Sequence, residues 1–346
     1  MTGEVEVIAP GLFTTVQDTR GRPEFQRYGV PVGGALDPFS AAAANALVGN
    51  PPEAAVLEIT LAGPTLGFSA ATAFALAGAD LGAVLNGVEP IPPGWSWLAR
   101  PGSSLSFGER RSGARSYVAF GGGLEVPIVL GSRSADTRAG YPGLAGRPLR
   151  TGDRLPVRSV ADVVLRCGRS LGLDFEADAP VRVLPGPHLD RFAADALDEF
   201  CSADWEIAEQ ADRMGYRLHG PTLRHIQGAD VASLGLPVGA VQVPGDGRPI
   251  VLLADHQPTG GYTVLACVIR ADLGLLAQRA PGEHVHFAPT TPDAARQALL
   301  AQRAQLQAVE SEDPAWAIVR CAESGGSAVL SPSSRGGPGG GVPARS

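Results

Sequence analysis

The stretch that decides the fold is Gln242-Val-Pro-Gly-Asp-Gly-Arg-Pro-Ile250, continued by Val251–Ala254 and Asp255-His-Gln-Pro-Thr-Gly-Gly-Tyr262. Its first part combines Pro, Gly and Asp, which is typical of a turn. The apolar run Ile250–Ala254 is bounded by such turn residues and predicts a buried strand. The strand therefore carries a dense group of polar side chains and glycines at its end.

Similar apolar runs between Gly, Pro, Asn and Asp recur along the chain, so the sequence predicts a mainly β protein with a few helices. Asn86-Gly87 predicts a hairpin turn because both residues tolerate a positive φ. The other expected strands are Val5–Ile8, Val56–Leu61, Thr72–Ala77, Tyr117–Phe120, Ile128–Leu130, Val181–Leu184, Thr263–Ile269 and His284–Phe287.

The clearest expected helix runs from Pro38 to Val48. Asp37 can cap its first turn, Pro38 suits the first helical position, and Gly49 suits the exit. Further helices are expected at Leu189–Phe200, Ala271–Gln278 and Pro292–Val309, the last with apolar residues spaced for one buried stripe.

The chain has 346 residues, which is enough for two domains. A boundary is expected near Gly168–Pro180, where a Gly-rich and then acidic stretch separates two strand-rich halves. We therefore predict domains at 1–175 and 176–312, the second ending in a helix. Residues 323–346 are rich in Ser, Gly and Pro and are expected to form a disordered tail.

Composition excludes several function classes. All 28 basic residues are arginine, so the chain can hold no biotin, lipoyl or Schiff base on a lysine and has no phosphate-loop lysine. A net charge of −7 argues against nucleic-acid binding. The sequence shows no membrane-spanning run and no secretion signal, so we expect a cytoplasmic protein.

The charge is unevenly distributed. Between Arg100 and Arg158 there are ten arginines against four acidic residues. Such a stretch is either a solvated mixed surface or an anion-binding face.

Cysteines and histidines do not predict a metal site. Cys167, Cys201, Cys267 and Cys321 are widely spaced and are expected to be reduced. His284-x-His286 would place two rings on one face of a strand, but no third ligand lies nearby in the sequence.

The polar group after Ala254 is the best candidate for catalysis. Gln257, Thr259 and the backbone of Gly260 and Gly261 can orient a polar substrate and stabilise developing negative charge, with Tyr262 beside them. Asp255 or His256 can act as general base. The alternative is a structural turn, although a turn does not need Gln and Thr.

A second glycine-rich segment, Gly29-Val-Pro-Val-Gly-Gly-Ala-Leu-Asp37, precedes the Pro38 helix. Gly33 and Gly34 allow close approach of the backbone to a ligand, the helix start favours an anion, and Arg22 can clamp a carboxylate. The alternative is a tight turn in which Asp37 is only an N-cap.

Two other polar segments carry charged groups. Gly131-Ser-Arg-Ser-Ala-Asp136 is a compact loop in which Arg133 can hold an anion, while Asp212 and Arg213 form a charged pair expected to be structural. The sequence has no nucleophile elbow, phosphate loop or dinucleotide fingerprint. Candidate pockets without an ATP motif suggest one component of a multi-subunit catalyst.

Taken together, these segments resemble a family with several names: allophanate hydrolase subunit 2, the C-type subunit of 5-oxoprolinase, and the biotin-dependent carboxyltransferase module of urea carboxylase. The matching stretches run from Pro10 to about Phe287. They are TTVQDTRGR (Thr14–Arg22), GVPVGGALDPFS with AANALVGN (Gly29–Asn50), LEITLAGP (Leu57–Pro64), VLGSRSAD (Val129–Asp136), DRMGYRLHGP (Asp212–Pro221) and VQVPGDGRPIVLLADHQPTGGY (Val241–Tyr262).

The resemblance implies two cyclophilin-like β-barrel domains. It also implies that the chain, inactive alone, is part of an ATP-dependent 5-oxoprolinase that converts 5-oxo-L-proline to L-glutamate. The expected partners are a smaller companion (allophanate hydrolase subunit 1-like, or the B-type subunit of 5-oxoprolinase) and an A-type subunit of the LamB/YcsF kind. ATP would be used by the assembly, with no evident site on this chain.

The same family allows two other functions. One is the carboxyltransferase module of a urea carboxylase or allophanate hydrolase system, in which a partner carries biotin. The other is a regulatory protein that binds a kinase-inhibitor-like companion. One departure from the family pattern is Pro258, where a Thr is expected, together with Thr263 in place of a Pro. Pro258 removes a backbone donor and a hydroxyl.

Overall fold

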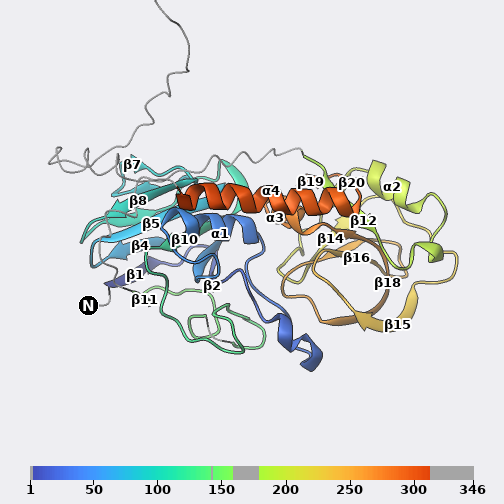
Figure 1. The fold of residues 1–346 in the computed structure, drawn as a ribbon, viewed down its shortest axis with the longest axis horizontal. Helices are drawn as coiled ribbons and strands as arrows, with labels where there is room; N and C mark the ends of the chain where they lie inside the picture. The colour runs from blue at the N-terminus through green and yellow to red at the C-terminus, as the bar shows by residue number, and fades with distance from the viewer. Residues whose placement is uncertain (1–2, 142, 159–178, 312–346) are drawn as a thin grey trace, which may run out of the picture.

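The structure is a computed structural model that describes residues 3–141, 143–158 and 179–311. Most of the expected boundary near Gly168–Pro180 and the expected tail at 323–346 lie outside these residues, as do Cys167 and Cys321. The division at residue 175 therefore stays a prediction. Figure 1 shows two strand-rich halves side by side, with one long helix lying across both.

The N-terminal half consists of two antiparallel sheets. Apolar side chains from both sheets, such as Val7, Phe68 and Phe74, form one core between them. One sheet has the order β11-β1-β4-β9-β6-β7, from β1 (Gly3–Ala9), β4 (Thr65–Phe68), β6 (Val84–Leu85), β7 (Glu89–Pro90), β9 (Ser104–Ser106) and β11 (Arg154–Val157). The other has the order β2-β3-β10-β5-β8, from β2 (Phe13–Gln17), β3 (Val56–Thr60), β5 (Thr72–Asp80), β8 (Trp95–Ala99) and β10 (Ser112–Phe120).

Helix α1 (Pro38–Leu47) covers the outer face of the second sheet. The alternation of side chains along β5 explains this packing, because Phe74 and Leu76 point into the core between the sheets. The small residues Ala73 and Ala75 point the other way and let the alanine-rich helix approach closely. A 3₁₀ helix, η1 (Pro23–Tyr28), precedes α1.

The C-terminal half is a nine-stranded, nearly closed barrel-like sheet. Its order is β19-β13-β14-β17-β16-β18-β12-β20, and β15 pairs with β18. Because β19 and β20 are consecutive in the chain, the two ends of the sheet come together. The strands are β12 (Val181–Pro185), β13 (Trp205–Ile207), β14 (Gly215–His219), β15 (Asp230–Gly235), β16 (Ala240–Val243), β17 (Ile250–Leu252), β18 (Thr259–Val268), β19 (His284–Val285) and β20 (Phe287–Pro289).

In the described C-terminal half, five helical segments lie outside this sheet. The expected helix over 189–200 is shorter than predicted: only η3 (Leu189–Arg191) and α2 (Ala196–Ser202) are helical. The expected helix over 271–278 consists of η4 (Arg270–Asp272) followed directly by α3 (Leu273–Ala277). The last element, α4 (Pro292–Ser311), agrees with the predicted C-terminal helix.

Most sequence-based expectations for the fold are confirmed, including the mainly β class and the Asn86-Gly87 hairpin, where both residues have positive φ. The expected strand Ile128–Leu130 is wrong. Val129 makes only an isolated bridge with Ser132, because this loop is stabilised mainly by side-chain hydrogen bonds.

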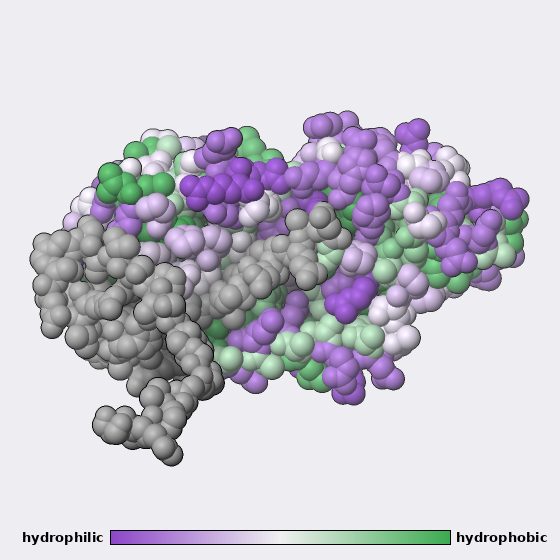
Figure 2. All heavy atoms as spheres, turned by 90° about the horizontal axis from the view of Figure 1, so that it is seen from above, coloured by the Kyte–Doolittle hydropathy of each residue, from purple (hydrophilic) through white to green (hydrophobic). Residues whose placement is uncertain are grey.

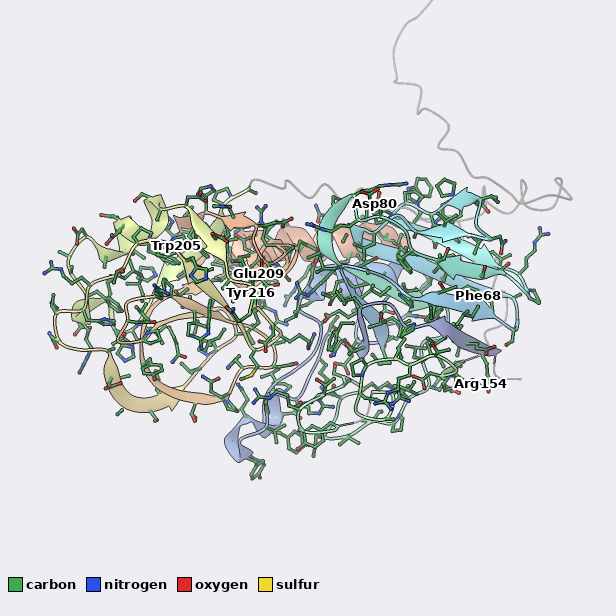
Figure 3. The ribbon with its side chains drawn as sticks, turned by 180° about the vertical axis from the view of Figure 1, so that it is seen from behind. Phe68, Asp80, Arg154, Trp205, Glu209 and Tyr216 are labelled. Atoms are coloured by element: carbon green, nitrogen blue, oxygen red, sulfur yellow. The ribbon has the colours of Figure 1, made fainter. Side chains whose placement is uncertain are left out.

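The two halves are joined by α4 and by buried polar contacts. In α4, Gln302 Nε2 donates to Ala271 O at 2.8 Å, and Val309 packs into the core beneath α1. Arg115 Nη1 of the N-terminal half also donates to the hydroxyl of Tyr216 at 2.6 Å. Tyr216 lies on the side of the barrel that faces the N-terminal half (Figure 3). These contacts hold the barrel against the N-terminal sheets.

The outer surface is dominated by polar residues on the face seen from above, with apolar residues in small patches (Figure 2). None of the helices in the described part of the chain has the length and apolarity needed to cross a membrane.

Candidate functional site

The two glycine-rich segments meet between the halves. The backbone N–H of Gly33 donates to Ala254 O at 2.9 Å, at the end of the strand that delivers Asp255. Gly33 and Gly34 have φ of +66° and +91°, a conformation that favours glycine. A Cβ on Gly33 would lie 3.5 Å from Arg22 Nη1 and 3.8 Å from Asp255 Oδ1. The absence of a side chain thus brings these charged groups next to the backbone.

Arg213 is the centre of an ionic network at this junction. Its Nε donates to Asp255 Oδ2 at 2.7 Å and its Nη2 to Asp255 Oδ1 at 3.0 Å. Nη1 binds Glu58, and Nη2 also donates to Gly34 O at 2.6 Å. One guanidinium therefore links two carboxylates and the glycine-rich backbone.

Burial makes this network energetically coupled. The side chains of Arg213 and Asp255 are each 10% exposed and that of Glu58 is 1% exposed. Burial raises the pKa of Asp255 more than Arg213 lowers it, whereas the two carboxylates raise the pKa of Arg213. The second oxygen of Glu58 accepts from the hydroxyl of Tyr117 and the N–H of Leu36, both at 2.8 Å.

Arg22 lies beside this network but has different partners. Its Nη2 donates to Ser134 O at 2.6 Å and its Nε to Val129 O at 3.2 Å, and its guanidinium lies over the ring of Tyr141. No carboxylate of the described residues forms an ion pair with it within 4 Å. Burial lowers the pKa of Arg22, although Asp18 and other nearby groups oppose this. A ligand can reach this cation only when the covering Tyr141 ring moves, because Arg22 is 1% exposed.

Asp37 is the N-cap of α1, which is the structural alternative to a role in ligand binding. Its Oδ1 accepts from the N–H of Ser40 at 3.0 Å, and Oδ2 accepts from the hydroxyl of Ser40 at 2.6 Å. Gln278 Nε2, from the other half, donates to Oδ2 at 3.0 Å. The carboxylate is buried and fully engaged, so the geometry gives a substrate-binding role no support.

The loop Gly131–Asp136 is organised by Asp18. Oxygens of Asp18 accept from the hydroxyls of Ser132 and Ser134 and from the N–H of Arg133, at 2.7–2.9 Å. Arg133 directs its Nε to Val126 O at 3.1 Å and stays half-buried. The predicted anion loop thus packs beside Arg22, with most of its polar groups already satisfied.

His256 is buried next to Asp255. Its Nδ1 lies 2.6 Å from Gln257 O, so Nδ1 carries the proton and donates. Its Nε2 is buried and has no hydrogen-bond partner in the described part of the chain. Burial lowers the pKa of His256, which keeps the ring neutral near pH 7.

The remaining predicted residues form an exposed strip at the start of β18. Gln257 and Thr259 are exposed, and Tyr262 is 43% exposed. The expected loop Thr259–Tyr262 is instead strand, because Gly260 pairs with Leu234 of β15. We call residues 257–262 the β18 strip.

The two unusual residues of this region both make hydrogen bonds with neighbouring segments. Pro258 O accepts from the N–H of Leu236 at 2.9 Å. Thr263 donates its backbone N–H to Ala229 O and its hydroxyl to Val243 O, contacts that a proline at this position would lack. Thr263 therefore suits the pairing of β18 with its neighbours, whereas the contact of Pro258 uses only its backbone carbonyl and does not explain the proline.

A metal site is not supported. Within residues 3–141, 143–158 and 179–311, no group of three or more His, Cys, Asp and Glu residues can hold a metal ion. His284 and His286 both face Asp204, at 2.7 and 3.5 Å. Cys201 and Cys267 are free.

Five of the ten arginines between Arg100 and Arg158 form ion pairs within the described residues, and this favours the solvated mixed surface. Arg110 binds Glu283 of the other half. Other pairs join Arg111 to Asp80, Arg147 to Asp153, Arg154 to Glu4 and Arg158 to Glu125.

Sequence reasoning missed the centre of the network. Arg213 was expected to pair with its neighbour Asp212, but Asp212 Oδ1 accepts from the N–H of Met214 at 2.8 Å instead. Glu58 is isolated among apolar residues in LEITLAGP, which predicts a buried carboxylate. Because a buried carboxylate needs a cation beside it, this pattern was the available indication of a distant partner.

Comparison with known proteins identifies the relatives of this architecture. A family model described as the carboxyltransferase domain, subdomain A and B, matches residues 28–289. The chain is 40% identical over 291 residues to the C-type subunit of 5-oxoprolinase from Escherichia coli K12, and the match covers 82% of this chain and 90% of the relative.

Two solved structures extend this comparison. The protein TTHA0988 is 41% identical with a TM-score of 0.74, covering 82% of this chain and 55% of its own. The K. lactis urea amidolyase is 30% identical with a TM-score of 0.82, covering 90% of this chain and 20% of its own. The chain thus spans about half of the former and a fifth of the latter.

Proposed function

The chain belongs to the family of the carboxyltransferase domain, subdomains A and B, and we propose that it is a subunit of an ATP-dependent 5-oxoprolinase. The observation that carries the proposal is the 40% identity over 90% of the C-type subunit of the E. coli 5-oxoprolinase. Such an enzyme opens the lactam of 5-oxo-L-proline to give L-glutamate. We further propose that it works with a smaller B-type companion and an A-type companion of the LamB/YcsF kind.

The arrangement of the site supports a role within a complex. The β18 strip offers an exposed amide, hydroxyl and phenol at the N-terminal end of β18, where this strand pairs with β15. The charged groups at the junction are buried and already paired. We therefore propose that the β18 strip faces the substrate and a companion protein, which closes the site.

The proposed roles of individual residues follow from their exposure. Ring opening places negative charge on the lactam oxygen, and Gln257 and Thr259 can donate hydrogen bonds to it. Asp255 has both oxygens bound to Arg213, so it acts as a base only if one of these bonds is exchanged. Otherwise it holds the guanidinium of Arg213 in place.

Substrate-carboxylate binding is assigned to arginine. Arg22 has no carboxylate partner and lies beside Gly33, whereas Arg133 is more accessible but directs Nε to the backbone. A displaced Tyr141 ring would open Arg22 to a carboxylate, which guanidinium groups bind in bidentate fashion.

The cofactors of this reaction would come from the partners. The chain has neither a phosphate loop nor any lysine, so its own residues do not fit covalent biotin. ATP would be consumed by the assembly.

A second function is favoured by one observation, the TM-score of 0.82 to the urea amidolyase together with the family description. In that alternative, the chain is a carboxyltransferase that accepts a carboxyl group from biotin carried by a partner. Avidin distinguishes the two, because it would abolish carboxyl transfer and leave 5-oxoprolinase activity unchanged.

The proposed function is tested by mixing the purified chain with its two companions and measuring glutamate and ADP from 5-oxoproline and ATP. Equal amounts of glutamate and ADP, with avidin present, are expected. ATP hydrolysis without glutamate, or carboxylated urea with a biotin protein, would favour the alternative.

A further inference from the structure

A cavity of about 830 Å³ lies between the two halves, beneath the first turns of α4. It is bounded on one side by the glycine-rich segment, including Gly33 and Leu36, and on the other by β18 and α3 residues such as Val268 and Leu273. Ala295 and Leu299 of α4 form its roof. We call it the α4 cavity. Its volume is in the range of roughly 300–1,000 Å³ that is typical of sites for small molecules.

The floor of the α4 cavity is apolar. Leu36, Leu253 and Leu273 belong to the barrel core, and their cavity-facing atoms provide a surface for an apolar or ring-shaped group. Such a floor favours burial of an apolar body by the hydrophobic effect.

The polar part of the lining is cationic. Arg20, Arg270 and Arg296 come from three separate elements, and no Asp or Glu is among the described residues that line the cavity. Arg270 and Arg296 have no ion-pair partner within 4 Å in the described part of the chain. Arg20 pairs only with the exposed Glu24, a kind of contact that contributes little.

A smaller cavity of about 280 Å³ adjoins the first and continues it along α4. The two share Thr19, Pro38, Arg270 and Leu299, and the smaller one adds Arg303. Arg296 and Arg303 lie seven residues apart and therefore on the same face of the helix. The arginines thus lie along both cavities, and the apolar floor lies on the other side of the α4 cavity.

We propose that the α4 cavity binds an organic anion with an apolar body, whose carboxylate or phosphate is held by Arg270 and Arg296. The three arginines are exposed and no described lining residue is a carboxylate, so the positive field of the cavity attracts an anion, and the apolar floor favours an anion with an apolar body. The volume well exceeds that of a single amino acid. Gly33 and Ala254 also line this cavity, so it adjoins the junction described above, but the proposal uses none of the residues given a role in ring opening.

The test uses the full chain and anilinonaphthalene sulfonate, a fluorescent aromatic anion, as probe. One dye is expected to bind per chain. Arg270→Glu with Arg296→Glu should weaken its binding about tenfold or more, since two attractive charges become repulsive. The matched control is Arg217→Glu with Arg248→Glu, two exposed arginines outside the cavity with the same change of net charge, and it should bind like the unaltered chain.

A second variant keeps all charges. Ala295→Phe places a larger side chain at the roof of the cavity and should also weaken binding of the dye. Circular dichroism and Tm report whether each variant is folded. Displacement of the dye by an aryl phosphate such as naphthyl phosphate would assign a phosphate ligand, and displacement by the matching naphthoate would assign a carboxylate ligand. Unchanged dye affinity in the folded charge-reversal or filled variant, or displacement by neither compound, overturns the site.

Discussion

Single charges determine the junction between the halves. Arg213 compensates both Glu58 and Asp255 in a region almost without solvent. Each of these ion pairs adds less to the free energy of unfolding than the removal of one partner takes away. The reason is that a buried charge without its partner keeps its full desolvation cost. The junction is therefore sensitive to changes that leave the fold's apolar core intact.

Replacing Arg213 with Met is expected to lower the free energy of unfolding by about 3–5 kcal/mol, because Glu58 and Asp255 lose their shared cation. Chemical denaturation measures this change. The control is Arg217→Met, an exposed position on β14 shortly after Arg213 in the chain, which should stay within about 0.5 kcal/mol. Similar stabilities for the two variants would show that the network does not hold the junction.

His256 is expected to make stability pH-dependent. Burial lowers its pKa in the folded chain, whereas an unfolded histidine has a pKa of about 6.5. As pH falls below that value, the unfolded state binds a proton that the folded state does not, so the free energy of unfolding decreases. His256→Gln should flatten part of this decrease between pH 7 and 5.

Urea denaturation at several pH values measures that slope. His284→Gln, at an exposed position, is the control and should keep it. The raised pKa of Asp255 acts in the opposite direction as the pH falls, but it is present in both chains and cancels when the variant is compared with the unaltered protein. An unchanged slope in His256→Gln would contradict the buried neutral ring.

Within the assembled enzyme, Gln257→Ala and Thr259→Ala are each expected to lower kcat by about 10²–10³-fold with little change in Tm, because an oxyanion donor is lost from an exposed position. Steady-state glutamate formation checks this. Gln227→Ala, another exposed glutamine of the same half, should retain full activity. Equal rates in all three variants would place the substrate away from the β18 strip.

At the scale of elements, the sequence predicted features that depend on neighbouring residues, such as helix ends. It did not predict features that depend on contacts between distant parts of the chain. The start and end of α1 follow from Asp37, Pro38 and Gly49, because capping is decided within one helical turn. The start of β18 was missed because Thr259 and Gly260 look like a loop until β15, about 25 residues earlier, pairs with them. Likewise, Glu58 and Arg213 are separated by 155 positions.

The candidate site shows the same limit. The sequence predicted that both glycine-rich segments carry chemistry, and the structure joins them through Gly33 and Ala254. The sequence could not show that Asp255 is buried and Gln257 is exposed, because burial depends on how the two halves pack. The roles of these residues in turnover stay predictions.

The N-cap of α1 has its own test. Asp37→Ala removes the bonds to Ser40 and to Gln278, and should lower the free energy of unfolding by about 2 kcal/mol. Asp195 also precedes a helix, α2, but its side chain makes no capping bond, so Asp195→Ala should change little. Thermal and chemical denaturation compare the two, and equal effects would contradict a special role for the Asp37 cap.

At the scale of the molecule, two strand-rich halves act as one unit because α4, the Arg213 network and the Gln278 contacts all cross between them. The junction is buried and its charges are paired, whereas the residues of the β18 strip such as Gln257 and Thr259 are exposed. This arrangement is what one component of a complex needs if a companion completes its site. Its relatives include both a 5-oxoprolinase component and part of a urea amidolyase.

The most direct measurement is the rate of glutamate formation from 5-oxoproline and ATP by the complete set of subunits, with this chain present and with it omitted. We expect ATP-dependent, avidin-resistant glutamate formation only when the chain is present, and none from the chain alone. Glutamate formation at the same rate without the chain, or none from the complete set, would contradict the proposed function.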